Sequence, residues 1–163
     1  MAIRVFLCVF LASFLLTGSA QAAKAEASDG DGCQKVKAIG VGQDLGNNMT
    51  TATISRGGIL NGTTAAQFTI TSFATFPDLP FSGQIVFTTK HGTLTLDLVG
   101  TFNALTGEFS GTGTPSAGTG RFAGATGELV LTGIEDFSTG AFTETITGTL
   151  CLADDDDDDG DDD

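Results

Sequence analysis

Apolar and polar residues alternate strictly in the middle of the chain. In the segment HGTLTLDLVGTF, Leu94, Leu96 and Leu98 are separated by threonine and aspartate. Successive side chains of a β-strand point to opposite faces, so the leucines share one face and the polar residues the other. Upstream, SGQIVFTT places Ile85 and Phe87 on one face of another strand, and KHG between the two has the composition of a tight turn. The pattern predicts a β-hairpin.

The same pattern extends over most of the chain. A second hairpin is predicted in residues 127–152, with Leu129 and Leu131 on one arm and Phe142 and Ile146 on the other, across the turn DFSTG. No window has the periodicity of a helix, and β-branched residues are frequent. Further strands are predicted at about 35–42, 48–56, 64–76 and 106–114. The predicted fold class is therefore all-β, with about eight strands.

Eight antiparallel strands hide their edges in a sandwich or in a closed barrel. Cys33 and Cys151 lie on the first and last predicted strands, where a disulfide would join the two edges that a barrel brings together. We therefore predict an eight-stranded antiparallel closed β-barrel, with a sandwich as the alternative. Closing a loop of about 120 residues would stabilise the fold by about 4–5 kcal/mol. Two buried free thiols are the alternative to the disulfide.

The ends of the chain differ in composition from the predicted barrel domain, residues 33–153. Residues 1–22 combine one arginine, an apolar run too short to cross a bilayer and a small-residue end, the order of a secretory signal peptide. Residues 23–32 are small and polar and predict a flexible leader, and residues 154–163 predict a disordered poly-Asp tail. We expect a secreted or periplasmic protein, cleaved near Ala22, with no stable membrane insertion.

The negative charge is concentrated in the tail, where nine of the twenty acidic residues lie. Residues 23–153 carry eleven acids and six bases and form no basic stripe, so nucleic acid is not an expected partner. We expect no cofactor and no specific metal site. A dense run of carboxylates attracts divalent cations weakly, and the residues expected to do so are Asp154, Asp155, Asp156, Asp157, Asp158 and Asp159.

The segment GTGRFAGATGELVL, residues 118–131, is the richest in glycine. A dinucleotide site needs G-x-G-x-x-G opening a helix, and a P-loop needs Lys and Ser or Thr after its last glycine. Neither pattern occurs, so we interpret these glycines as turn and bulge positions, with Phe122 filling apolar space. The segment resembles the glycine-rich segment of the allene oxide cyclase and dirigent families, in which G-T/S-G, one residue, Phe and A/G-x-x-G lead into a barrel strand.

The resemblance covers Gly118 to Gly127 and, in the number and order of strands, residues 34–152. It implies an eight-stranded antiparallel barrel whose apolar interior holds a lipid epoxide or phenolic radicals. The chain has neither the tyrosine nor the tryptophan expected in a dirigent pocket. We carry over no catalytic residue from these families.

Four charged residues are candidates for chemistry. Glu144 falls between Phe142 and Ile146 on the same face, which would point it into the barrel, where burial raises a carboxyl pKa toward that of a useful acid or base. The alternative is a shifted register or an exposed rim position. Asp97 is expected on the solvated face of its strand. His91 lies in a turn, and Arg121 is either a solvated surface residue or a contact for an anionic ligand at the barrel mouth.

The leading interpretation is a secreted, non-catalytic β-barrel module that binds one small apolar ligand inside the barrel. One alternative is a cyclase- or dirigent-like enzyme with Glu144 as its catalytic group; another is a structural or surface-interaction protein with a cation-binding acidic tail. Association into a homo-oligomer through outer strand faces is left open. The residues expected to line the ligand site are Phe68, Phe87, Leu94, Leu96, Leu98, Phe102, Leu129, Leu131 and Ile146.

Overall fold

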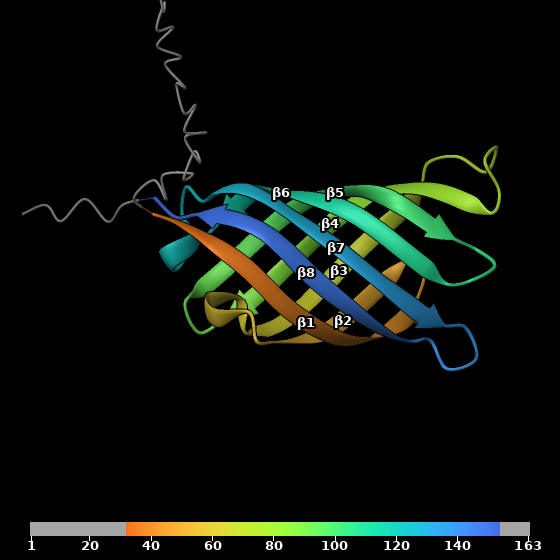
Figure 1. Cartoon of the computed structure of the whole chain (residues 1–163), viewed down its shortest axis with the longest axis horizontal. Coiled ribbons are helices and arrows are strands. Elements are labelled where there is room, and N and C mark those ends of the chain that lie inside the picture. The colour runs from red at the N-terminus through yellow and green to blue at the C-terminus, as the bar shows by residue number, and fades with distance from the viewer. Residues whose placement is uncertain (1–31, 154–163) are drawn as a thin grey trace, which may run out of the picture.

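The predicted strands form a closed barrel in the computed structural model, which describes residues 32–153. Neighbouring strands are antiparallel, and each follows its sequence neighbour around the barrel (Figure 1). The strands are β1 (Cys33–Gly46), β2 (Met49–Ser55), β3 (Gly62–Ile70), β4 (Asp78–Thr89), β5 (Gly92–Asn103), β6 (Glu108–Gly118), β7 (Thr126–Asp136) and β8 (Ala141–Cys151). The eight-stranded antiparallel closed barrel is therefore confirmed.

The barrel closes where β1 pairs with β8. Residues 33–43 of β1 pair with residues 141–151 of β8, and this register sets Cys33 directly opposite Cys151. The two cysteines form a disulfide with their Cα atoms 3.8 Å apart. The predicted disulfide is therefore confirmed, and it links the first and last residues of the eight strands.

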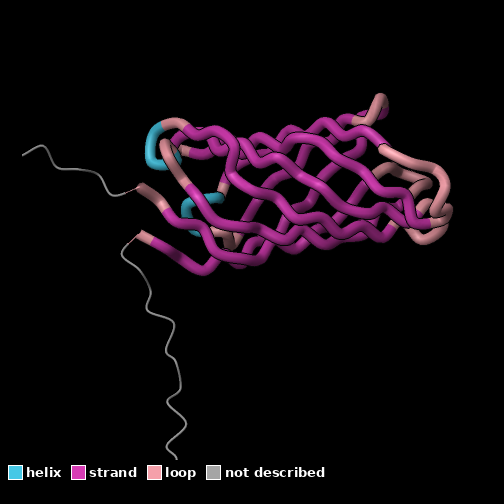
Figure 2. The backbone as a smooth tube through the Cα atoms, turned by 90° about the horizontal axis from the view of Figure 1, so that it is seen from above, coloured by secondary structure: helices cyan, strands magenta, loops and turns pink. Residues whose placement is uncertain are grey.

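The two ends of the barrel differ. The disulfide end holds both ends of the described chain and two short 3₁₀ turns, η1 (Gly58–Leu60) and η2 (Gly120–Phe122) (Figure 2). The opposite end, called here the loop end, holds the connections at residues 47–48, 71–77, 104–107 and 137–140.

The disulfide half of the barrel is filled by side chains. Leu60 of η1 and Phe122 of η2 are fully buried and pack into the same core as the inward residues of the strands. The largest fully buried side chains are Phe87, Phe122, Leu60, Leu94, Leu96, Leu129, Ile146 and Leu150. Because the two 3₁₀ turns supply apolar side chains from outside the sheet, this half of the barrel is a packed core.

The glycine-rich segment connects β6 to β7 through η2. Gly120 has a φ of +59°, and a Cβ there would collide with the carbonyl oxygen of His91. Gly118 lies so close to the carbonyl oxygen of Phe122 that a Cβ would not fit. These glycines allow the tight turn that places Phe122 in the core. The chain then enters the strand β7, as predicted for turn glycines, whereas a phosphate-binding loop would lead into a helix.

Several strand boundaries differ from the sequence prediction. The strand expected at about 35–42 runs from Cys33 to Gly46. The strand expected at 64–76 ends at Ile70, because residues 71–77 form a loop in which the Phe76 amide donates to the Phe73 carbonyl. The strand expected at 106–114 runs instead from Glu108 to Gly118. Pro115 is tolerated there because the pairing of β6 with β7 stops at Gly113, so no partner strand on that side needs its missing amide.

Candidate functional site

A cavity of about 370 Å³ occupies the loop half of the barrel. Its walls come from all of the strands and are mostly apolar, with phenylalanines the commonest side chains. Such a volume suits a small organic ligand. The lining residues are Asp44, Asn48, Thr50, Thr64, Phe68, Ile70, Leu79, Phe81, Ile85, Leu98, Phe102, Phe109, Gly111, Leu131, Glu135, Phe137, Phe142 and Glu144.

The nine residues expected to line a ligand site divide between the two halves of the barrel. Four of them line the cavity: Phe68, Leu98, Phe102 and Leu131. The other five are buried in the packed core and do not reach the cavity: Phe87, Leu94, Leu96, Leu129 and Ile146. All nine side chains point inward, as alternation predicts, and their depth along the barrel axis separates the two groups.

Sequence reasoning missed several cavity residues, chiefly Leu79, Phe81 and Phe109. Phe81 lies on the same face of β4 as Ile85, so extending the alternation toward the strand end would have found it. Phe81 contacts Phe68 edge-to-face at 5.3 Å between ring centroids, and Phe109 contacts Phe142 similarly at 6.0 Å. These aromatic pairs form much of the cavity wall.

Glu144 is the buried ionisable residue of the cavity. It lies on β8 with only 6% of its surface exposed, and it is flanked in register by Gly40 of β1 and Gly133 of β7. A Cβ on Gly40 would lie 2.5 Å from both Cγ and Oε1 of Glu144, so the glycine leaves the room that the carboxylate occupies. The inward orientation predicted from Phe142 and Ile146 agrees with this position.

Burial raises the pKa of Glu144 to about 7. No hydrogen bond from the described residues, and no neighbouring charge among them, contributes to the shift. A carboxyl with such a pKa changes protonation state near neutral pH, so it can act as a hydrogen-bond donor, a proton acceptor or a counter-ion.

Two further carboxyl groups, Asp44 and Glu135, line the cavity nearer the loop end. The pKa of Glu135 is raised, mainly by partial burial and also by the nearby charge of Asp44. Asp44 accepts a hydrogen bond of 2.8 Å from the Gly46 amide, which holds it beside the β1–β2 turn. The mouth of the cavity is therefore acidic.

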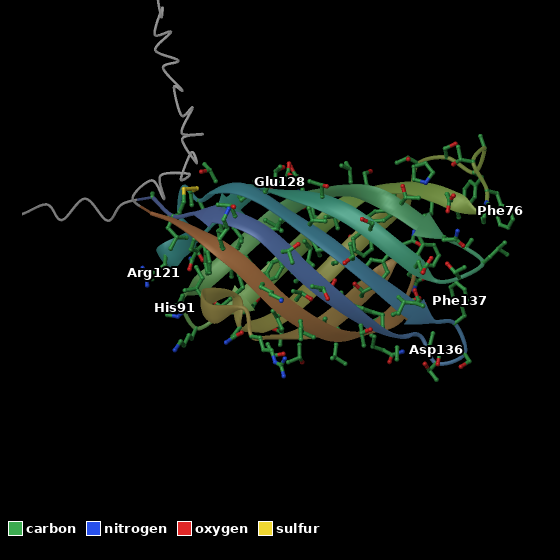
Figure 3. All side chains as sticks on the ribbon, viewed as in Figure 1. Phe76, His91, Arg121, Glu128, Asp136 and Phe137 are labelled. Carbon is green, nitrogen blue, oxygen red and sulfur yellow. A yellow bond between two sulfur atoms is a disulfide. The ribbon has the colours of Figure 1, made fainter. Side chains whose placement is uncertain are left out.

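The other charged candidates lie away from the cavity. Asp97 is exposed on the outer face of β5 and accepts hydrogen bonds from Gln84 (2.8 Å) and Ser116 (3.1 Å). His91 and Arg121 lie together at the disulfide end (Figure 3), where the Arg121 amide donates to the His91 carbonyl at 3.0 Å. Arg121 thus lies at the opposite end of the barrel from the cavity, so it does not meet a ligand there.

Exposed apolar side chains gather at the loop end. Six of them project from the four connections or the residues beside them, with exposures between 45% and 72%: Leu45, Met49, Phe73, Phe76, Leu105 and Phe137. Figure 3 shows Phe76 and Phe137 at this end. Phe137 also lines the cavity and contacts Phe102 edge-to-face, with ring centroids 5.9 Å apart. Apolar side chains therefore surround the cavity mouth, and an apolar ligand can contact them as it enters.

Several expectations fall on other parts of the chain. The predicted signal peptide, nearly all of the predicted leader and the poly-Asp tail lie outside the described residues. Within residues 32–153, no group of three or more histidine, cysteine or acidic side chains is arranged to hold a metal ion. No helix in that range is both long and apolar enough to cross a membrane.

In comparisons with known proteins, no family model matches the chain, and no curated protein matches it.

Proposed function

We propose that the protein is a binding module that holds one small apolar molecule in the loop half of its barrel. The observation that carries the proposal is the cavity of about 370 Å³ with largely apolar walls, next to a half-barrel that is fully packed. Eight strands enclose either a filled interior or space for one small ligand. Here Leu60 and Phe122 of the two 3₁₀ turns help to fill one half of the interior, and the other half holds the cavity.

The test is a titration with the apolar fluorescent probe N-phenylnaphthylamine. We expect saturable binding with one site per chain. Leu131→Trp adds bulk to the cavity wall and should weaken binding at least ~10-fold, since overpacking a defined site is costly. Thr132→Trp is the matched control, because Thr132 is the exposed next residue on β7. Absence of saturable binding to the native protein, or equal binding by the two variants, would overturn the proposal.

A second candidate function, a cyclase-like enzyme of the allene oxide cyclase/dirigent type, is favoured by one observation. Glu144 presents a carboxyl group with a pKa of about 7 to an apolar cavity, as an acid–base catalyst requires. Incubation with a lipid epoxide, followed by product analysis, tests it. Turnover by the native protein and none by Glu144→Gln would support the enzyme, and no turnover by the native protein would remove it.

We also propose that the protein works in an oxidising compartment, secreted or periplasmic. The Cys33–Cys151 disulfide supports this, because structural disulfides persist mainly outside the cytosol. Amino-terminal sequencing of the exported protein is expected to show a new terminus near Ala23. An intact Met1 on exported protein would contradict cleavage.

A further inference from the structure

The ionisable groups around the cavity all have the same sign. Glu144 lies in the wall, and Asp44 and Glu135 lie nearer the mouth, while the lining residues include no lysine, arginine or histidine. Acidic residues continue around the loop end at Asp78 and Asp136, where β4 starts and β7 ends.

The basic residues of the barrel lie in its other half. Lys35 and Lys37 are near the start of β1, Arg56 follows β2, Lys90 is in the β4–β5 turn, and Arg121 is in η2. These are all of the lysines and arginines in residues 32–153. No described cation is therefore placed to neutralise a carboxylate in the cavity.

Glu144 is the group that most needs such a cation. More than nine-tenths of its surface is buried, no described hydrogen bond reaches it, and it lines the cavity. Gly40 and Gly133 flank it on both neighbouring strands, and neither supplies a polar side chain. An ionised carboxylate in such a place is costly unless an opposite charge pairs with it.

We propose, on the basis of the binding function proposed above, that the cavity takes an apolar amine: a molecule with one protonated amino group on an aliphatic or aromatic body. The ammonium group would pair with Glu144 and donate hydrogen bonds to its carboxylate. The body would contact the phenylalanine rings of the wall, whose faces also attract a cation. The amine must pass Asp44 and Glu135, whose negative charge attracts an ammonium and repels an anion.

The chemistry of the site separates this ligand class from two others. A fatty acid or another anion would meet three carboxyl groups and no base. A neutral apolar molecule would fill the cavity but leave Glu144 without a partner, so its binding would weaken as the carboxyl group ionises. The carboxylate of Glu144 would strengthen the binding of an amine by pairing with it, and it would weaken the binding of the other two classes.

The experiment compares two probes of matched shape, naphthylmethylamine and naphthylmethanol, by calorimetric titration at about pH 8, where a carboxyl with a pKa near 7 is ionised. We expect the native protein to bind the amine at least ~10-fold more tightly than the alcohol, as charge-assisted hydrogen bonds allow. Glu144→Gln should reduce this preference to within ~3-fold. Glu128→Gln makes the same change on an exposed residue of the disulfide half and should keep the preference.

The pH dependence of the native protein is a second measurement that needs no variant. The preference for the amine should grow as pH rises from about 6 to about 8, because Glu144 ionises over that range. The other titratable groups that line the cavity are Asp44 near the end of β1 and Glu135 on β7, both acidic, and neither contributes to the pKa shift of Glu144.

The outcomes distinguish the two proposals. Equal binding of amine and alcohol by the native protein, or an undiminished preference in Glu144→Gln, would overturn the amine inference and leave cavity binding intact. Binding of neither probe would overturn both.

Discussion

Replacing Glu144 with glutamine should change how the stability of the protein depends on pH. Glutamine keeps the size of the side chain and removes its ionisation. In the native protein the carboxyl group is buried beside Gly40 and Gly133, with a surface exposure of only 6%. The substitution therefore isolates the free energy of placing a charge at this point of the barrel.

The size and sign of the effect follow from the pKa. Burial raises the pKa of Glu144 from its ordinary 4.5 to about 7. Between these values the folded protein holds a proton that the unfolded chain releases, so the free energy of unfolding falls as pH rises. In this range the free energy of unfolding falls by about 1.4 kcal/mol per pH unit. The stabilisation is fully present below pH 4.5, and about 3 kcal/mol of it has been lost above about pH 7.

The assay is urea unfolding of both proteins, followed by circular dichroism, at several values between about pH 4 and about pH 8. Glutamine does not titrate, so the free energy of unfolding of the variant should rise by about 3 kcal/mol relative to that of the native protein between about pH 4 and about pH 8. Glu135, whose pKa is also raised, is present in both proteins and cancels in the difference. Parallel stability curves for the two proteins would refute the reasoning, since Glu144 would then titrate alike in the folded and unfolded states.

Three further predictions concern the fold and the cavity mouth. Reducing the Cys33–Cys151 disulfide should lower the free energy of unfolding by about 4–5 kcal/mol, and an unchanged urea midpoint would contradict the role of the barrel clamp. Gly118→Ala should destabilise the protein by about 1–3 kcal/mol, because its Cβ would meet the carbonyl oxygen of Phe122; thermal unfolding measures this, and an unchanged melting temperature would show that η2 yields easily. Phe137→Ala should speed release of N-phenylnaphthylamine several-fold in stopped-flow dilution, since Phe137 covers part of the cavity; an unchanged release rate would mean that the ligand leaves by another route.

Local alternation predicted the strands and much of the interior, and the positions of Cys33 and Cys151 favoured a barrel over a sandwich. The leucines of β5 and the series from Phe142 to Ile146 on β8 point inward because alternation depends only on neighbouring residues. The same pattern placed Glu144 inside, and the position of the two cysteines at the ends of the strand series predicted the clamp. These features need no knowledge of distant contacts.

The depth of each residue along the barrel could not be predicted in the same way. Leu96 and Leu98 follow the same pattern, yet Leu96 lies in the packed core and Leu98 lines the cavity. The difference depends on Leu60 and Phe122, which enter from turns far away in sequence and fill only the disulfide half. That Asp44 and Glu135 line the same cavity as Glu144 likewise depends on the strand register.

The disulfide joins the two ends of the barrel chain, so that the eight strands form a covalent ring. The chain that leaves Cys33 returns to Cys151 after eight strands, and the Cα atoms of these residues are 3.8 Å apart. A protease that cuts once in any connecting loop would thus open the ring without releasing a piece, and the fragments would separate only after reduction. A gene with its ends moved into the 137–140 loop and a short peptide joining the old ends should encode the same barrel.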